Sequence, residues 1–89
     1  MLFKNKRFLI TGGTGSFGSA TIKKLINQKV KEIVIFSKDE KKQHDLRLQY
    51  KGNQKINFVV GDIRDYQSIK NALSNIDYVF HAAALKQVP

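Results

Sequence analysis

Short apolar runs alternate along the chain with segments in which apolar residues recur at helical spacing. The runs lie at residues 7–11, 32–36, 56–60 and 78–84, and each is expected to be a strand. The first suits a buried strand, and the second, which has no polar alternation, is typical of a strand covered on both faces of a parallel sheet. Between them, helices are expected from Ser16 to about Asn27, from Asp39 to about Tyr50, and after Asp65, which we expect to cap its helix. This order predicts an α/β fold: a Rossmann-type, doubly wound parallel sheet with helices on both faces.

The expected helices differ in how much of their surface is apolar. The first has a broad apolar face, made of Phe17, Ala20, Thr21, Ile22, Leu25 and Ile26. The second is highly charged and is predicted to be mostly exposed, with Leu46, Leu48 and Tyr50 near its end. The third places Ile69, Ala72, Leu73 and Ile76 at positions i, i+3, i+4 and i+7.

Composition excludes several classes of protein. With 89 residues the chain has room for one small domain, and without cysteine it has no disulfide or thiolate metal site. His44 and His81 lie too far apart in sequence to form a local metal-ligand pair. No apolar run approaches the roughly 18 residues of a membrane span, and no export signal is visible. We therefore expect a cytoplasmic protein without a metal or a membrane span.

The net charge of +9, from 16 basic and 7 acidic residues, first suggests a nucleic-acid partner. The lysines are scattered, however, and only Lys38, Lys41 and Lys42 are dense. Most of them are expected to keep the surface solvated. We therefore expect no nucleic-acid partner.

A glycine-rich loop joins the first expected strand to the first helix. Gly12, Gly15 and Gly18 have the spacing G-x-x-G-x-x-G. Such glycines allow a tight turn, close approach of the backbone to a pyrophosphate, and close packing of the helix on the sheet. The free N–H groups and the positive end of the helix dipole then face the anion. Between a strand and a helix, this loop indicates dinucleotide binding.

The end of the second strand is where such domains distinguish NAD from NADP. The residues there are Ser37, Lys38, Asp39, Glu40, Lys41 and Lys42. Ser37 and Lys38 occupy the first exposed positions, where an acid would select NAD, so charge complementarity favours NADP over NAD. Asp39 has a competing interpretation as the N-cap of the next helix.

Two further strand ends reach the same edge of the expected sheet. Asp62 is placed to accept a hydrogen bond from the adenine amino group while Ile63 packs on the ring, although Asp62 is also a common turn residue. After the fourth strand, Ala82 and its alanine neighbours offer small side chains where the backbone passes close to a cofactor. His81 is interpreted as a structural histidine.

These motifs resemble a known family. Residues 11–18, 62–63 and 81–84 are similar to the N-terminal part of the extended short-chain dehydrogenase/reductases. More narrowly, the strings FSKDEKKQ (36–43), GDIRD (61–65) and HAAALKQVP (81–89) resemble the inverting UDP-N-acetylglucosamine 4,6-dehydratases of bacterial polysaccharide and flagellin-sugar synthesis. The last string is the most specific, and the likeness extends over essentially the whole chain.

The resemblance implies a set of roles for residues of this chain. NADP would be tightly held, with Thr14, Gly15, Ser16 and Phe17 lining the pyrophosphate, residues 37–42 the 2′-phosphate, and Ala82 the ribose. Lys86 would lie near the nicotinamide and the sugar of UDP-N-acetylglucosamine or a related UDP-sugar. The family oxidises the sugar at C4, eliminates water across C5 and C6, and returns the hydride to C6, giving a 4-keto-6-deoxy sugar with inverted C5.

The family's catalytic groups, an Asp-Lys pair and a Tyr-x-x-x-Lys helix, lie beyond Pro89. Tyr66 and Lys70 have the second spacing, but they follow the Asp62 turn and are not expected to be catalytic. We therefore expect residues 1–89 to be the N-terminal portion of an NAD(P)-binding domain in a longer, homo-oligomeric enzyme, without catalytic residues of its own. A UDP-sugar 4- or 5-epimerase and a non-catalytic NADP-binding module remain as alternatives.

Overall fold

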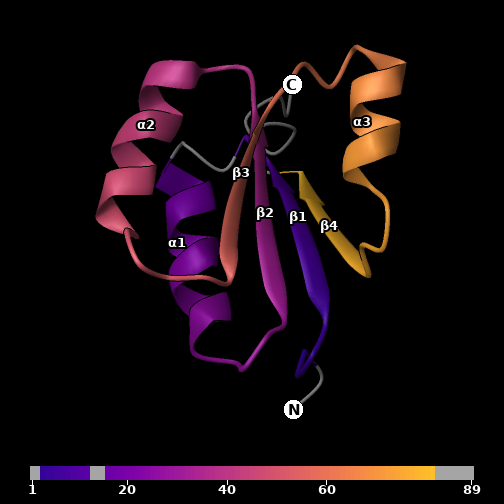
Figure 1. Ribbon diagram of the computed structural model, residues 1–89. Helices are drawn as coiled ribbons and strands as arrows, with labels where there is room; N and C mark the ends of the chain where they lie inside the picture. The colour runs from indigo at the N-terminus through magenta and orange to yellow at the C-terminus, as the bar shows by residue number, and fades with distance from the viewer. Residues whose placement is uncertain (1–2, 13–15, 82–89) are drawn as a thin grey trace.

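A computed structural model describes residues 3–12 and 16–81 of the chain, with the backbone only at residues 16 and 17. The elements follow in the order β1 (Arg7–Thr11), α1 (Ser16–Ile26), β2 (Glu32–Ser37), α2 (Glu40–Gln49), β3 (Ile56–Val60), α3 (Tyr66–Ala72) and β4 (Tyr78–His81) (Figure 1). The expected alternation of strands and helices is confirmed.

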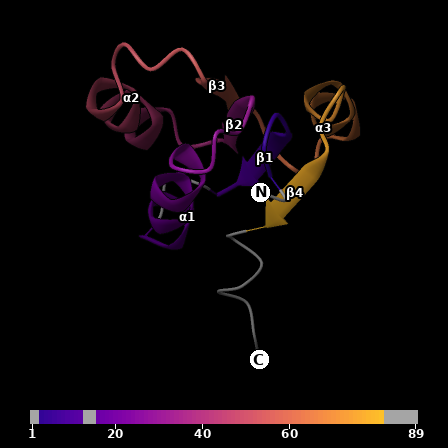
Figure 2. The same ribbon diagram turned by 90° about the horizontal axis from the view of Figure 1, so that it is seen from below.

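The strands form one parallel sheet in the order β3-β2-β1-β4. Helices α1 and α2 lie on one side of this sheet, and α3 lies on the other (Figure 2). This is the predicted Rossmann-type arrangement. Because every strand runs the same way, all four carboxyl ends meet at one edge of the sheet.

Two apolar cores fill the space on either side of the sheet. The larger one joins α1 and α2 to the strands and consists of Phe8, Ile10, Ile22, Leu25, Val30, Ile33, Ile35, Leu46 and Ile56. The smaller one contains Leu9, Val34 and Phe36, against which Ile69, Ala72 and Ile76 pack. Strands β1 and β2 are therefore buried on both faces, as their lack of polar alternation predicts.

Two sequence expectations are corrected by the structure, and one strand is more exposed than the central two. Ala20 of α1 is exposed and does not belong to the buried face. Helix α3 ends at Ala72, so Leu73 is its C-cap, 40 % exposed, and Ile76 reaches the core from the following turn, where Asn75 has a φ of 63°. Val59 and Val60 are 37 % and 49 % exposed, because β3 is an edge strand.

Leu25 and Leu48 provide a matched test of this packing, since their side chains are 3 % and 58 % exposed. Leu25→Ala is expected to lower the free energy of unfolding by about 2–5 kcal/mol through lost burial and a cavity. Leu48→Ala is expected to change it by less than about 0.5 kcal/mol. Chemical denaturation of both variants checks this, and equal losses would contradict the assigned core.

Candidate functional site

The carboxyl ends of β1, β2 and β3 surround a pocket of about 700 Å³. The register pairs Thr11 with Phe36, and Ser37 with Val60, so the chain leaves the three strands at nearly the same level. The pocket is lined by Thr11, Gly12, Phe36, Ser37, Lys38, Asp39, Gly61, Asp62, Ile63 and Arg64. Three of the turns that sequence analysis singled out are thus brought together.

The turn after β1 has the backbone conformation that the glycine motif requires. Gly12 has a φ of 69°, in the left-handed region that favours glycine, and its N–H donates to the carbonyl of Phe36 at 3.1 Å. Helix α1 begins four residues later, and Gly18 is buried in it. Thr14 and Gly15, and the side chains of Ser16 and Phe17, lie outside the described residues.

The turn after β2 is held by its own side chains. The Ser37 hydroxyl accepts from the N–H of Asp39 at 3.1 Å, and the Asp39 carboxylate accepts from the N–H of Lys42 at 3.0 Å. Asp39 is therefore the N-cap of α2. Glu40, Lys41 and Lys42 are exposed in the first turn of α2, and Lys38 lines the pocket. Lys38 and Asp39 therefore both bring charge to the pocket, and one Asp39 oxygen is already engaged by the helix.

A buried glutamine on α2 ties the turns after β2 and β3 together, and sequence reasoning missed it. The Gln43 amide donates to the carbonyl of Ser37 at 3.1 Å and to that of Val59 at 2.9 Å, and the side chain is 1 % exposed. The Ser37 carbonyl also accepts from the N–H of Gly61 at 3.0 Å. The signal was present, since Gln43 precedes Leu46 by three residues and shares its buried helical face.

Asp62 and Arg64 form an ion pair in the turn after β3. The Arg64 guanidinium lies 2.8 Å from one carboxylate oxygen of Asp62, and the Arg64 N–H donates to the other at 2.9 Å. These hydrogen bonds, with a smaller effect of Lys38, hold the pKa of Asp62 well below its ordinary value. The ion pair thus favours the charged form of Asp62, a hydrogen-bond acceptor at the pocket wall. Arg64, which sequence analysis left without a role, also lines this pocket.

Gly61 and Ile63 complete that wall. A Cβ on Gly61 would lie 2.7 Å from Cζ of the buried Phe36 ring, so the packing of this ring against the turn favours glycine. Ile63 is 48 % exposed at the pocket, which leaves an apolar surface for a flat ring. The residues present therefore fit the adenosine half of a dinucleotide: a glycine turn, an apolar wall, a fixed acceptor and a cation.

The remaining predicted site residues follow β4. Nδ1 of His81 lies 2.9 Å from the hydroxyl of buried Thr11, which gives the ring a partner within the sheet and agrees with a structural histidine. Ala82 and Lys86 lie outside the described residues.

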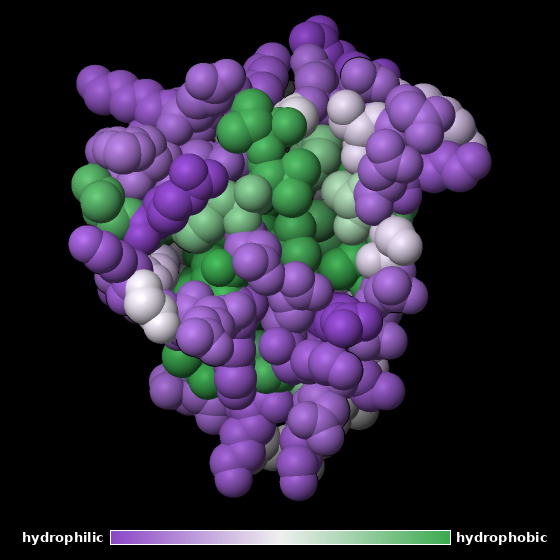
Figure 3. Space-filling view, in the orientation of Figure 1, coloured by the Kyte–Doolittle hydropathy of each residue, from purple (hydrophilic) through white to green (hydrophobic). Residues whose placement is uncertain are grey.

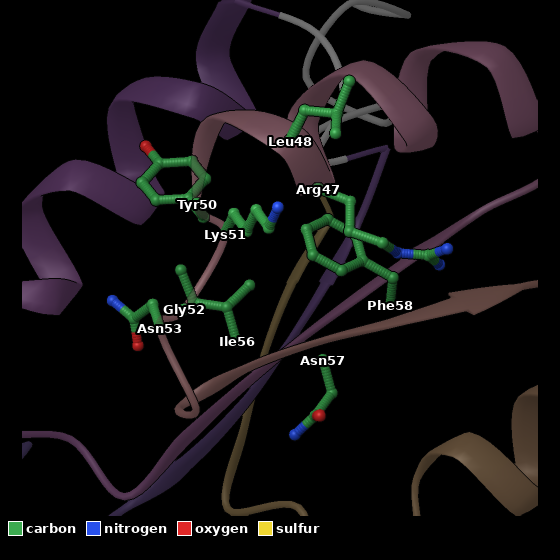
Figure 4. Close-up of a pocket in the computed structure, with 9 residues that line it drawn as sticks. All are labelled: Arg47, Leu48, Tyr50, Lys51, Gly52, Asn53, Ile56, Asn57 and Phe58. Carbon is green, nitrogen blue, oxygen red and sulfur yellow. The ribbon is translucent and has the colours of Figure 1, made fainter.

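A second hollow, of about 460 Å³, lies where α2 ends and β3 begins. Figure 4 shows Arg47 beside the ring of Phe58, and the guanidinium carbon is 5.2 Å from the ring centroid. Lys51, Gly52 and Asn53 come from the turn after α2. This hollow is at the opposite end of the strands from the first pocket.

In residues 3–12 and 16–81 there is no group of three or more histidine, aspartate or glutamate side chains placed to hold a metal ion. None of the helices in this part of the chain is long and apolar enough to cross a membrane.

The parallel order β3-β2-β1-β4, with a glycine turn and a pocket at its carboxyl edge, defines a Rossmann-type domain. Residues 8–89 match the family described as polysaccharide biosynthesis protein, and the chain belongs to that family.

Curated relatives agree with this family. The chain is 54 % identical to a protein of Rickettsia bellii and 53 % identical to one of Rickettsia prowazekii, each named UDP-glucose 4-epimerase. Both alignments cover 99 % of this chain but 27 % of the relative. The chain therefore spans about a quarter of the length of the curated relatives that it matches.

Solved structures show the same fold. The structure named Pen, from Bacillus thuringiensis, is 42 % identical, with a TM-score of 0.92 over 99 % of this chain and 28 % of that one. WbmF from Bordetella bronchiseptica, solved in complex with NAD+ and UDP, is 21 % identical, with a TM-score of 0.72 over 90 % of this chain and 23 % of that one. At that identity, the likeness to WbmF shows the fold alone.

Gln43→Met keeps the length of the side chain and removes both hydrogen bonds that it donates. We expect the free energy of unfolding to fall by about 1–2 kcal/mol, and the Gly61 amide to exchange faster because the two strand ends separate more readily. Gln67→Met, at an exposed glutamine on α3, is the matched control. Unchanged exchange at Gly61 in the Gln43 variant would show that the glutamine does not hold these turns.

Proposed function

We propose that this chain is the N-terminal, dinucleotide-binding portion of an enzyme that converts UDP-sugars with a nicotinamide dinucleotide. The observation that carries the proposal is the pocket at the carboxyl ends of β1, β2 and β3, which combines the Gly12 turn with Lys38, Asp62 and Ile63. Membership of the polysaccharide biosynthesis family and relatives named UDP-glucose 4-epimerase support the substrate class.

The chain's own residues would bind and orient the cofactor. Gly12, Gly15 and Gly18, with Thr14, Ser16 and Phe17, would leave backbone N–H groups facing the pyrophosphate at the start of α1. Asp62 would accept from the adenine amino group, for which Arg64 must share or release one carboxylate oxygen, and Ile63 would cover the ring. Ala82 would allow close approach of the ribose, and Lys86 would contact the UDP-sugar.

The bound nicotinamide would supply a hydride acceptor and donor for C4 of the sugar, a first step that two reactions share. In a 4,6-dehydratase, water then leaves across C5 and C6 and the hydride returns to C6. The strings at residues 36–43, 61–65 and 81–89 favour this reaction, which we place first. In a 4-epimerase, the hydride returns to the other face of C4, and the names of the relatives favour this second candidate.

Incubation of the full-length protein with UDP-N-acetylglucosamine and, separately, with UDP-glucose distinguishes the two reactions. A 4-keto-6-deoxy product, followed by NMR, is expected for the dehydratase, and a C4 epimer for the epimerase. If the protein carries bound dinucleotide but neither sugar changes, the proposed substrate class is wrong.

We further propose that NADP is preferred over NAD, with the residues from Ser37 to Lys42 at the adenosine 2′-phosphate. Lys38 and Asp39 both line the pocket, but Asp39 has one carboxylate oxygen engaged as the N-cap of α2, whereas Lys38 is in no ion pair within the described residues. This arrangement suits a phosphate better than a ribose hydroxyl.

Lys38→Ala in the full-length protein is expected to weaken NADP binding about tenfold, a loss of about 1.4 kcal/mol, and to leave NAD binding within twofold, because NAD lacks the 2′-phosphate. Calorimetric titration with each cofactor measures both affinities. Lys70→Ala, on α3, is the control. Equal losses for NADP and NAD would contradict the role of Lys38, and wild-type preference for NAD would contradict the proposed cofactor.

A further inference from the structure

Within the described residues, the positive charge is concentrated at the end of the sheet opposite the pocket. The described part of the carboxyl edge is balanced, because Lys38, Lys41, Lys42 and Arg64 stand beside Asp39, Glu40, Asp62 and Asp65. The amino edge, where the strands begin, carries six exposed lysines: Lys4, Lys6, Lys29, Lys31, Lys51 and Lys55. Figure 3 shows hydrophilic residues covering this lower end of the molecule.

Nothing in the described residues neutralises these six lysines. The two acids at this edge have other partners: Glu32 lies 3.5 Å from Nε of Arg7 and accepts from Asn57 at 2.6 Å, and Asp77 accepts from the N–H of Arg7 at 2.8 Å. Among residues 3–12 and 16–81, no lysine forms an ion pair. The described part of this edge therefore has an excess of positive charge, and its lysines are not held in ion pairs.

The backbone fixes the turns that carry these lysines. The N–H of Asn5 donates to the carbonyl of Lys29 at 3.0 Å, and the N–H of Lys31 donates to that of Lys6 at 2.9 Å. The carbonyl of Lys55 accepts from Ile33 at 2.8 Å. Three separate turns are thus joined into one surface, which we call the amino-edge lysine surface.

Lys29 has an unusual backbone conformation for a lysine. Its φ is 55°, in the left-handed region just after α1, where glycine is the residue that adopts this conformation without strain. Glycine would fit this backbone conformation better than lysine, but it would carry no charge. Lys29→Gly therefore removes the charge without straining the backbone, so a loss of binding in this variant can be distinguished from a loss of folding stability.

We propose that the amino-edge lysine surface docks the protein on an anionic lipid bilayer. A lysine ammonium group is a point charge and suits a diffuse anionic surface, whereas the planar arginine guanidinium suits a phosphate in a fixed position. The arginine at this edge, Arg7, is paired with Glu32. Two aromatic rings here, Phe3 and Tyr78, pack against Phe8 at centroid distances of 5.1 and 5.2 Å and do not offer a stacking platform for bases. Docking this way leaves the pocket open to solution.

The test compares two variants of the full-length protein that each lose two positive charges. Lys29→Gly with Lys31→Gln removes them from the amino-edge lysine surface, and Lys41→Gln with Lys42→Gln removes them from the opposite edge. Both are mixed with phosphatidylcholine vesicles containing roughly 30 % phosphatidylglycerol, with pure phosphatidylcholine vesicles, and with a DNA duplex, at low and at physiological salt. Binding is measured by cosedimentation with the vesicles and by fluorescence anisotropy with the duplex.

We expect the wild-type protein to bind the anionic vesicles and not the neutral ones, with affinity falling as salt rises. Each lysine removed from this surface should weaken binding about fivefold, so Lys29→Gly with Lys31→Gln loses about 25-fold while the opposite-edge variant stays within twofold. The melting temperature of the Lys29→Gly variant alone should be unchanged or higher, which separates lost charge from lost folding. Equal losses in the two double variants, no binding to anionic vesicles, or tighter binding to the duplex would each overturn the proposal.

Discussion

Parallel pairing of β1 between β2 and β4 is the constraint on which the rest of this structure depends. Phe8, Leu9 and Ile10 are fully buried, and they hold both cores together because their side chains alternate between the two faces. The same pairing sets Thr11 beside Phe36 on one side and His81 on the other, so the chain leaves these strands at one level. The pocket is a consequence of this register, since a one-residue slip of β2 would reverse the faces of its side chains and move the Ser37–Asp39 turn away from Gly12.

The sequence predicted the elements well where packing is simple. Strands β1 and β2 lie at the centre of the sheet, so their uninterrupted apolar runs report burial on both faces directly. Prediction was weaker at β3 and α3, because β3 lies at the edge of the described sheet and α3 has no buried residue. Apolar spacing places Leu73 and Ile76 on one helix, but Asn75 adopts a left-handed turn and Ile76 reaches the core from a loop. The spacing of apolar residues alone cannot show whether Ile76 reaches the core from a helix or from a loop.

The candidate site could be predicted in part, where its residues have local sequence signatures. Glycine and aspartate at strand ends have local signatures, and the Gly12 turn and the Asp39 cap appear as the sequence suggested. Gln43 and Arg64 were missed because their roles depend on contacts that appear only in the folded chain. Gln43 donates to the carbonyl of Val59, 16 positions away, and the Arg64 guanidinium binds the Asp62 carboxylate in the pocket wall. From sequence alone, a polar residue such as Gln43 on a charged helix is expected to be exposed, and only the positions of the neighbouring strands show that it is buried.

The distribution of charge changes the meaning of the basic composition. A domain whose cations served phosphate binding alone would concentrate them at the carboxyl edge, where the glycine turn and helix N-terminus already favour anions. Among the residues that the structure describes, that edge holds as many acids as cations, and Arg64 there is paired with Asp62. The excess lies instead beside the C-termini of α1 and α2, where the helix dipoles stabilise positive charge. The fold itself therefore accommodates the amino-edge lysines. Their cost is mutual repulsion rather than lost packing, so this surface is free to bind a partner.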